Sequence, residues 1–215
     1  MSLKHEIEIM QQELLPQIPK AVLETLLATT EKLVQSGIAD KSLKKDDKAP
    51  PFTLPNATGK SVNSSELLKD GPLVVSFYRG GWCPYCNVEF HVLQQAYPEM
   101  KRLGAKLVAI SPQTPDNSLS TYEKHALTFE VLSDVGNRVA RDFGLVFALA
   151  EEVRPIYKEF SFDIPAYNGD DSFEIPIPAT YVISSDGLIV YSFVDADYSH
   201  RAEPIDIIEV LRGLF

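Results

Sequence analysis

The chain has few cysteines and no long hydrophobic run. A membrane-spanning helix needs about 20 consecutive apolar residues, and the best candidate, GLVFALA at 144–150, falls far short of that length. The two cysteines are too few for a four-ligand zinc site unless histidines complete it, and the histidines are scattered without metal-ligand spacing. We therefore expect no membrane span, no metal and no other cofactor.

Basic residues are also in deficit. The sequence has 20 Lys and Arg against 30 Asp and Glu, a formal net charge of −10. Such a chain repels phosphate backbones and anionic lipid, so we expect neither nucleic acid nor a membrane as a partner. The first residues, MSLKHEIEIM, lack the apolar core of an export signal. We expect a cytoplasmic, reducing location, where a close cysteine pair is more often catalytic or metal-binding than structural.

The first part of the chain has apolar residues at helical spacing. Pro16 and Pro19 interrupt the pattern, which predicts two helices within 3–38 with a joint between them. A polar segment, ADKSLKKDDK, follows the second helix. The sequence therefore predicts an N-terminal helical extension over residues 1–45, connected to a main domain over 46–215.

Short extended segments then alternate with helical ones. Buried strands are predicted at 73–78 and 105–111, with a helix at 88–103 between them, which implies a parallel pair in an α/β sheet. The remaining predicted elements are a helix near 119–126, a strand at 129–132, a helix near 137–143, two strands joined by a turn at Ser185–Gly187, and a closing helix over 204–214. The segment 145–178 is rich in proline and aromatic residues, has no clean period, and is interpreted as an insertion.

The two cysteines lie in FYRGGWCPYCNVEF, directly after the first buried strand and at the start of the following helix. The exposed N–H groups and positive dipole of a helix start favour a thiolate, and Arg79 is close enough in sequence to add to that field. Pro84 holds the sulfurs within reach of one another, which suits a reversible disulfide. On these local grounds Cys83 attacks and Cys86 resolves. Zinc binding and two inert buried thiols are the alternatives.

Five segments in this order resemble the peroxiredoxins of the alkyl hydroperoxide reductase and thiol-specific antioxidant superfamily, over residues 49–214. They are KAPPFTLPNATGKSVNSSEL, VVSFYRGGWCPYC, LVAISPQ, VLSDVGNRVARDFGL and PATYVISSDGLIV. The resemblance implies an α/β, thioredoxin-like three-layer fold, with a mixed central sheet flanked by helices. The first segment is similar to the hairpin that opens peroxiredoxins, and the last is similar to their final hairpin.

The resemblance also implies roles for the residues of the cysteine motif. Cys86 falls on the peroxide-attacking position of peroxiredoxins, and Cys83 on the threonine that precedes it. Against thioredoxin, however, Cys83 is the attacking and Cys86 the resolving cysteine. We expect the peroxide-reactive sulfur to be Cys86. This expectation differs from the assignment based on the helix start alone, in which Cys83 attacks. Trp82 and Tyr85, beside the pair, are expected to contact the substrate.

Two departures from the peroxiredoxin and thioredoxin patterns affect the expected site. Pro178 replaces a peroxiredoxin arginine that polarises the peroxide; it matches the thioredoxin proline instead, so we expect a cis bond at Ile177–Pro178 and a substrate contact. Ser76 replaces the buried acid of thioredoxin, which leaves Glu89 as the candidate for proton transfer, or else as an exposed helix charge. The missing positive charge is expected to come from one of three arginines: Arg79, Arg154 or Arg201.

These features predict an antioxidant thiol–disulfide oxidoreductase. In the first hypothesis it reduces hydrogen peroxide or organic hydroperoxides through Cys83 and Cys86, with a thioredoxin-like donor or a small thiol as reductant. The alternatives are a protein disulfide reductase without peroxidase activity and a redox-sensing interaction module. We expect a homodimer through the N-terminal helices or the insertion. The polar segment 197–204 is interpreted as a connecting loop rather than part of the rim of the site.

Overall fold

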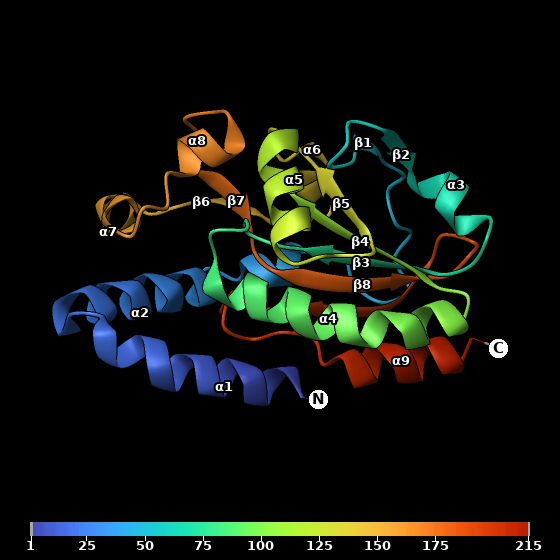
Figure 1. Ribbon diagram of the computed structural model, residues 1–215, viewed down its shortest axis with the longest axis horizontal. Coiled ribbons are helices and arrows are strands. Elements are labelled where there is room, and N and C mark those ends of the chain that lie inside the picture. The colour runs from blue at the N-terminus through green and yellow to red at the C-terminus, as the bar shows by residue number, and fades with distance from the viewer. Residues whose placement is uncertain (1, 215) are drawn as a thin grey trace.

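The computed structural model describes residues 2–214. Its N-terminal part forms α1 (Leu3–Leu14), η1 (Leu15–Gln17), α2 (Lys20–Gln35) and η2 (Ile38–Lys41), so the joint falls at the prolines, as predicted. Helix α1 lies along the long helix α4 (Pro84–Arg102) (Figure 1). The Glu203 carboxylate accepts hydrogen bonds from the backbone N–H groups of Leu3 and Lys4, which are unpaired donors at the start of α1. The helical extension is therefore fastened to the C-terminal part of the chain.

A mixed five-stranded sheet forms the centre of the molecule, with the order β5–β4–β3–β8–β9. The strands β3, β4 and β5 are parallel, whereas β8 runs antiparallel to β3, and β9 antiparallel to β8. Their bounds are β3 (Leu73–Phe77), β4 (Lys106–Ser111), β5 (Glu130–Ser133), β8 (Ala179–Ile183) and β9 (Ile189–Val194). The prediction of a thioredoxin-like α/β fold with a mixed sheet is confirmed.

Side chains alternate between the two faces of the sheet, as the pleat requires. On one face, Val74 and Leu107 pack with apolar residues of α4 and of the closing helix α9 (Pro204–Arg212). On the other face, Val75 and Val108 pack with a hairpin and two short helices that complete the third layer. These elements are β1 (Thr53–Pro55), β2 (Ser61–Asn63), α3 (Ser64–Leu68) and α6 (Arg138–Asp142). Helix α5 (Pro115–Lys124) packs beside β5.

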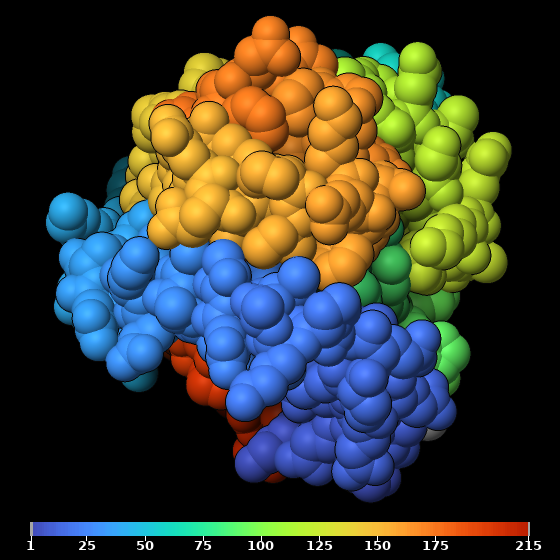
Figure 2. All heavy atoms as spheres, turned by 90° about the vertical axis from the view of Figure 1, so that its left-hand side faces the viewer, coloured from blue at the N-terminus to red at the C-terminus, as the bar shows by residue number. Residues whose placement is uncertain are grey.

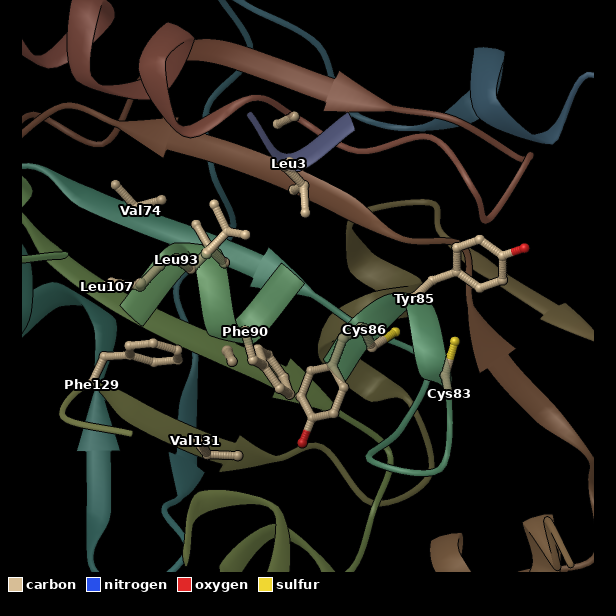
Figure 3. Packing of buried hydrophobic residues seen from close by; sticks show 14 of the residues in the cluster. Leu3, Val74, Cys83, Tyr85, Cys86, Phe90, Leu93, Leu107, Phe129 and Val131 are labelled. Carbon is tan, nitrogen blue, oxygen red and sulfur yellow. The ribbon is translucent and has the colours of Figure 1, made fainter. Parts of the chain in front are cut away.

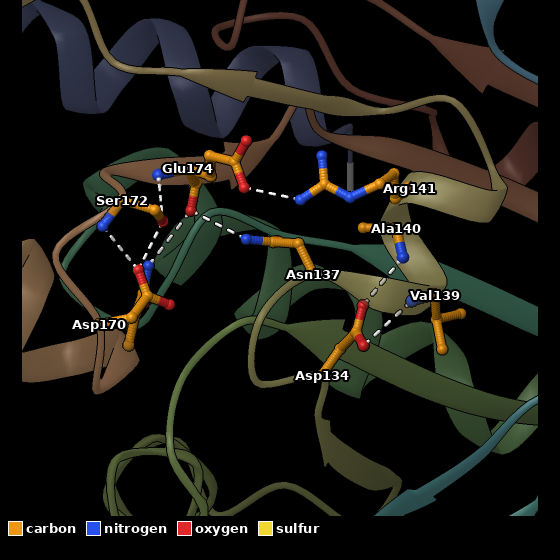
Figure 4. Close-up of polar contacts among 9 residues, drawn as sticks. Asp134, Asn137, Val139, Ala140, Arg141, Asp170, Ser172 and Glu174 are labelled. Carbon is orange, nitrogen blue, oxygen red and sulfur yellow. Dashed lines mark hydrogen bonds and ion pairs between the residues drawn. The ribbon is translucent and has the colours of Figure 1, made fainter.

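The segment interpreted as an insertion has its own regular structure. It contains β6 (Val146–Ala148), η3 (Glu151–Val153), α7 (Arg154–Glu159), α8 (Ile164–Asn168) and β7 (Glu174–Pro176), and β6 pairs with β7 in a small antiparallel sheet. Asn137 and Arg141, at the α6 end of the main domain, bind the backbone oxygen and the carboxylate of Glu174 at 2.9 and 2.6 Å (Figure 4). These contacts fix β7 to the main domain.

The segment predicted to be a polar linker is hydrogen-bonded to the main domain. Leu43 donates its backbone N–H to Phe143, and Asp46 donates its own to Ile189. The division of the chain at residue 45 stays a prediction. Among the described residues, no helix is both long enough and apolar enough to cross a membrane.

Candidate active site

Helix α4 begins at Pro84, so both cysteines lie at its first turn (Figure 3). Cys83 is the N-cap residue, and its N–H donates to the Gly80 carbonyl at 3.0 Å. The turn before it requires glycine, because Gly80 has φ +153° and a Cβ there would collide with Trp82. A Cβ on Gly81 would collide with Thr121. The two glycines thus allow the chain to turn from the strand into α4 at a place where neighbouring side chains leave no room for a Cβ.

Cys83 faces a cavity and lies beside a positive charge. Arg79 Nη1 donates to the sulfur of Cys83 at 3.8 Å, and Cys83 is among the residues that line the cavity. Burial raises the pKa of Cys83, but the hydrogen bond with Cys86 and the charges of Arg79 and Arg201 outweigh it and lower the pKa to about 5. These surroundings therefore favour the thiolate form of Cys83.

Cys86 lies one turn further into the helix and is completely buried. Both cysteines are free thiols, and their sulfur atoms lie near one another at the first turn of α4 (Figure 3). Burial raises the pKa of Cys86 well above its usual value, and so do its hydrogen bond and its proximity to the Cys83 thiolate. Arg201 Nη2 is 3.6 Å from the Cys86 sulfur and opposes that rise. The surroundings therefore act on the two sulfurs in opposite directions, lowering the pKa of Cys83 and raising the pKa of Cys86.

Arg201 and Glu89 form a buried ion pair next to Cys86. Arg201 Nε donates to Glu89 Oε2 at 2.7 Å, and their side chains are 2% and 3% exposed. Ser76 Oγ donates to the other carboxylate oxygen at 3.3 Å. Burial raises the pKa of Glu89 to about 7, although Arg201 acts to lower it. Glu89 is thus a buried group that titrates near neutral pH, and the alternative of an exposed helix charge is wrong.

Aromatic rings surround the other arginine of the site. Arg79 donates to the hydroxyl of Tyr157, and its guanidinium carbon lies 4.2 Å from the ring centre of Tyr198 and 5.0 Å from that of Trp82. Such contacts stabilise a desolvated cation. Tyr157 comes from α7 and Tyr198 from the segment after β9, so two distant parts of the chain hold Arg79 beside the thiolate.

Trp82 and Tyr85, the expected substrate contacts, both line the cavity next to Cys83. The cavity has a volume of about 360 Å³. The Trp82 ring packs against Tyr157 and Phe162 with centroids 5.5 Å away in each case. The Tyr85 hydroxyl accepts a hydrogen bond from Gln11 of α1 at 3.3 Å. Both aromatic residues therefore connect the cysteine turn to the added segments.

Some expectations need correction. No cis peptide bond occurs among the described residues, so the Ile177–Pro178 bond is trans. Pro178 directly precedes β8, so the chain continues from it into an extended strand. The trans form is favoured for bonds before proline unless the surrounding structure stabilises the cis form. Pro178 is buried and is not among the described residues that line the cavity. Arg154 lies elsewhere, because it binds the Leu149 carbonyl and stacks on Phe173.

The segment 197–204 belongs to the rim of the site, whereas the sequence favoured a plain connecting loop. It supplies Tyr198 and Arg201, and the backbone oxygens of Tyr198 and His200 accept hydrogen bonds from the Arg201 guanidinium. Tyr157 was missed as a site residue as well. The sequence signal was weak in both cases: a tyrosine and an arginine within a polar segment, and a tyrosine within an irregular one. Only folding brings these residues next to the cysteines.

The chain belongs to the AhpC/TSA family, whose profile matches residues 46–192. It is 34% identical over 96 residues to the chloroplastic peroxiredoxin Q of Sedum lineare, a match that covers 45% of this chain and 51% of that protein. It is 28% identical over 163 residues to the peroxiredoxin Bcp of Escherichia coli K12, covering 76% of this chain and 93% of that protein. The chain spans about half the length of the peroxiredoxin Q proteins that it matches.

A crystal structure of the peroxidoxin BcpB of Mycobacterium tuberculosis superposes with a TM-score of 0.64 at 23% identity, covering 80% of this chain and 99% of that one. A reduced 2-Cys peroxiredoxin from Plasmodium vivax superposes with a TM-score of 0.62 at 14% identity, covering 80% of this chain and 82% of that one. At these identities the likeness establishes the fold.

Proposed function

We propose that this protein is a thiol-dependent peroxidase that reduces hydroperoxides through Cys83 and Cys86. One observation carries the proposal: two neighbouring sulfurs of opposite pKa shift, each beside its own buried arginine, with the thiolate facing a cavity. Membership of the AhpC/TSA family and the similarity to peroxiredoxins Q and Bcp support it. A cytoplasmic location stays a prediction.

In the first step, the Cys83 thiolate attacks the terminal oxygen of the hydroperoxide. A sulfur–oxygen bond forms while the oxygen–oxygen bond breaks, so sulfur is oxidised by two electrons to a sulfenic acid. The departing alkoxide or hydroxide takes up a proton and leaves as alcohol or water. Arg79 donates to the Cys83 sulfur at 3.8 Å, and in this proposal its charge also stabilises the negative charge that develops on the departing oxygen.

The assignment of this step to Cys83 differs from the expectation based on the peroxiredoxin pattern, which placed peroxide at Cys86. Both cysteines are buried, but only Cys83 is among the described residues that line the cavity. Its pKa is lowered to about 5, whereas the pKa of Cys86 is raised. A nucleophile must be both ionised and accessible. These two conditions favour the assignment based on the helix start, in which Cys83 attacks and Cys86 resolves.

In the second step, Cys86 resolves the sulfenic acid. Once Cys83 no longer carries a negative charge, one cause of the raised pKa of Cys86 is gone, and Arg201 remains to stabilise its thiolate. The Cys86 sulfur then attacks the sulfur of Cys83, the disulfide forms, and the hydroxyl group leaves as water with the Cys86 proton. Glu89, with its pKa of about 7, is suited to take up and release that proton. Arg201 contacts both the Glu89 carboxylate and the Cys86 sulfur, and so holds the two groups close together.

In the third step, an external dithiol returns the pair to its reduced form. A thioredoxin-like donor, or a small thiol, supplies two electrons and two protons by thiol–disulfide exchange. The homodimer expected from the sequence stays a prediction. Three aromatic residues of the insertion, Tyr157, Phe160 and Phe162, pack within this chain rather than standing free for a second subunit.

Stopped-flow mixing of the fully reduced protein with hydrogen peroxide or an organic hydroperoxide tests the proposal. We expect disulfide formation many times faster than the reaction of free cysteine at the same pH. Sustained turnover should follow when a thioredoxin system is added. Oxidation no faster than that of free cysteine by either peroxide, together with rapid reduction of insulin disulfides, would instead identify a disulfide reductase.

A further inference from the structure

The cavity beside Cys83 is built mainly from segments outside the thioredoxin-like core. One wall comes from α1, η1 and α2, the opposite wall from the insertion, and the floor from the cysteine turn. Figure 2 shows α2 lying directly against the insertion on this side of the molecule, with α1 below α2 in this view. The two added segments thus enclose the approach to the thiolate together.

The walls of the cavity are apolar. Leu14, Leu23 and Leu27 contribute from the N-terminal helices, and Phe160 and Phe162 from the insertion. Among the described residues that line it, the charged groups are Arg79, which is occupied by the thiolate and Tyr157, and one carboxylate, Asp197. No lysine lines it within the described chain. The surface between the thiolate and the opening therefore suits an uncharged, apolar group.

The size of the cavity exceeds what hydrogen peroxide requires. A dry cavity of roughly 150 Å³ accepts benzene, and ligand pockets begin at about 300 Å³. At about 360 Å³ this cavity has room for an aromatic or branched alkyl group in front of the sulfur.

We propose that α1, α2 and the insertion form a binding site for the apolar group of a bulky, uncharged organic hydroperoxide, with its peroxide end directed at Cys83. The inference rests on the proposed peroxidase function, and it makes the N-terminal helices a specificity element. Burial of the apolar group supplies binding energy that hydrogen peroxide cannot obtain. The peroxide is cleaved as in the first step above, and the alcohol that forms is the bulky product released from the cavity.

The binding part of the proposal is tested without turnover. Trp82 is the only tryptophan of the chain and lines the cavity, so its fluorescence reports on occupancy. The probe is 2-phenylpropan-2-ol, the alcohol formed from cumene hydroperoxide. Leu27 is 59% exposed at the cavity, so Leu27→Glu places a charge there without disturbing the core. The matched control is Val34→Glu, 48% exposed on the same helix and outside the residues that line the cavity.

We expect saturable binding of the alcohol to the native protein and to the Val34→Glu variant, and binding weaker by about tenfold in the Leu27→Glu variant. The ratio of kcat/KM for cumene hydroperoxide to kcat/KM for hydrogen peroxide should fall about tenfold in Leu27→Glu alone. Absence of binding, or equal effects of the two substitutions, overturns the inference while leaving hydrogen peroxide reduction intact. Binding of the alcohol by a protein that reduces neither peroxide would overturn the proposed function, and the hydroperoxide assignment with it.

Discussion

The guanidinium of Arg79 lies 3.8 Å from the sulfur of Cys83, and both side chains are buried. The remaining contacts of Arg79 are with aromatic side chains, and its Nε has no hydrogen-bond partner among the described residues. A buried cation with so few polar contacts depends on a nearby negative charge. The thiolate and the guanidinium therefore stabilise each other, and each should respond when the other is removed.

Removal of the Arg79 charge should raise the pKa of Cys83. In an Arg79→Met variant the attractive charge is gone while much of the packing volume stays, and a rise of about 1 to 3 units is expected. The pKa is measured from the ultraviolet absorbance of the thiolate as a function of pH. Arg154→Met is the control, because Arg154 binds a backbone carbonyl away from the sulfurs. An unchanged thiol pKa in Arg79→Met would show that Arg79 does not stabilise the thiolate.

The reaction with peroxide should depend on pH as the titration of Cys83 does. Its pKa is lowered to about 5, so the reactive, deprotonated form prevails above that pH and is lost below it. The second-order rate constant of sulfenic acid formation is expected to rise as the pH increases through about 5 and then to level off. A rate that climbs steadily toward the ordinary thiol pKa would contradict a stabilised thiolate at the attacking position.

Separation of the buried Glu89–Arg201 pair should destabilise the protein. Glu89→Gln leaves the Arg201 guanidinium buried without its carboxylate, and a loss of about 3 to 5 kcal/mol in the free energy of unfolding is expected. The double variant Glu89→Leu/Arg201→Met removes both charges and should lose less. Urea unfolding of the reduced proteins measures the difference.

The exposed pair Glu66–Lys69 provides the control for that experiment, since both side chains are 66% exposed. Glu66→Gln should cost less than about 1 kcal/mol. If Glu89→Gln costs no more than Glu66→Gln, the buried pair contributes nothing to stability.

Local patterns were sufficient for the core of the fold and for the position of the thiol pair. The β-branched run that became β3 and the proline at the first position of α4 identify a strand followed by a helix start. Arg201 could be named only as one of three candidates, because it lies 112 residues from its partner Glu89. Tyr157 and Tyr198 were beyond sequence reasoning, since their contacts with Arg79 exist only once the insertion and the segment after β9 have folded over the site. The Ile177–Pro178 prediction was wrong because a shared motif position does not fix the isomer of the bond.

The most direct test of the account is to locate the sulfenic acid after a brief exposure of single-cysteine variants to peroxide, using a dimedone-type trap and mass spectrometry. Cys86→Ser removes the resolving sulfur, so this variant should accumulate a trapped product at Cys83. In the Cys83→Ser variant, Cys86 stays buried without its partner and should be trapped far more slowly. Rapid trapping at Cys86 in Cys83→Ser, with none at Cys83 in Cys86→Ser, would contradict the assignment of the attacking thiolate.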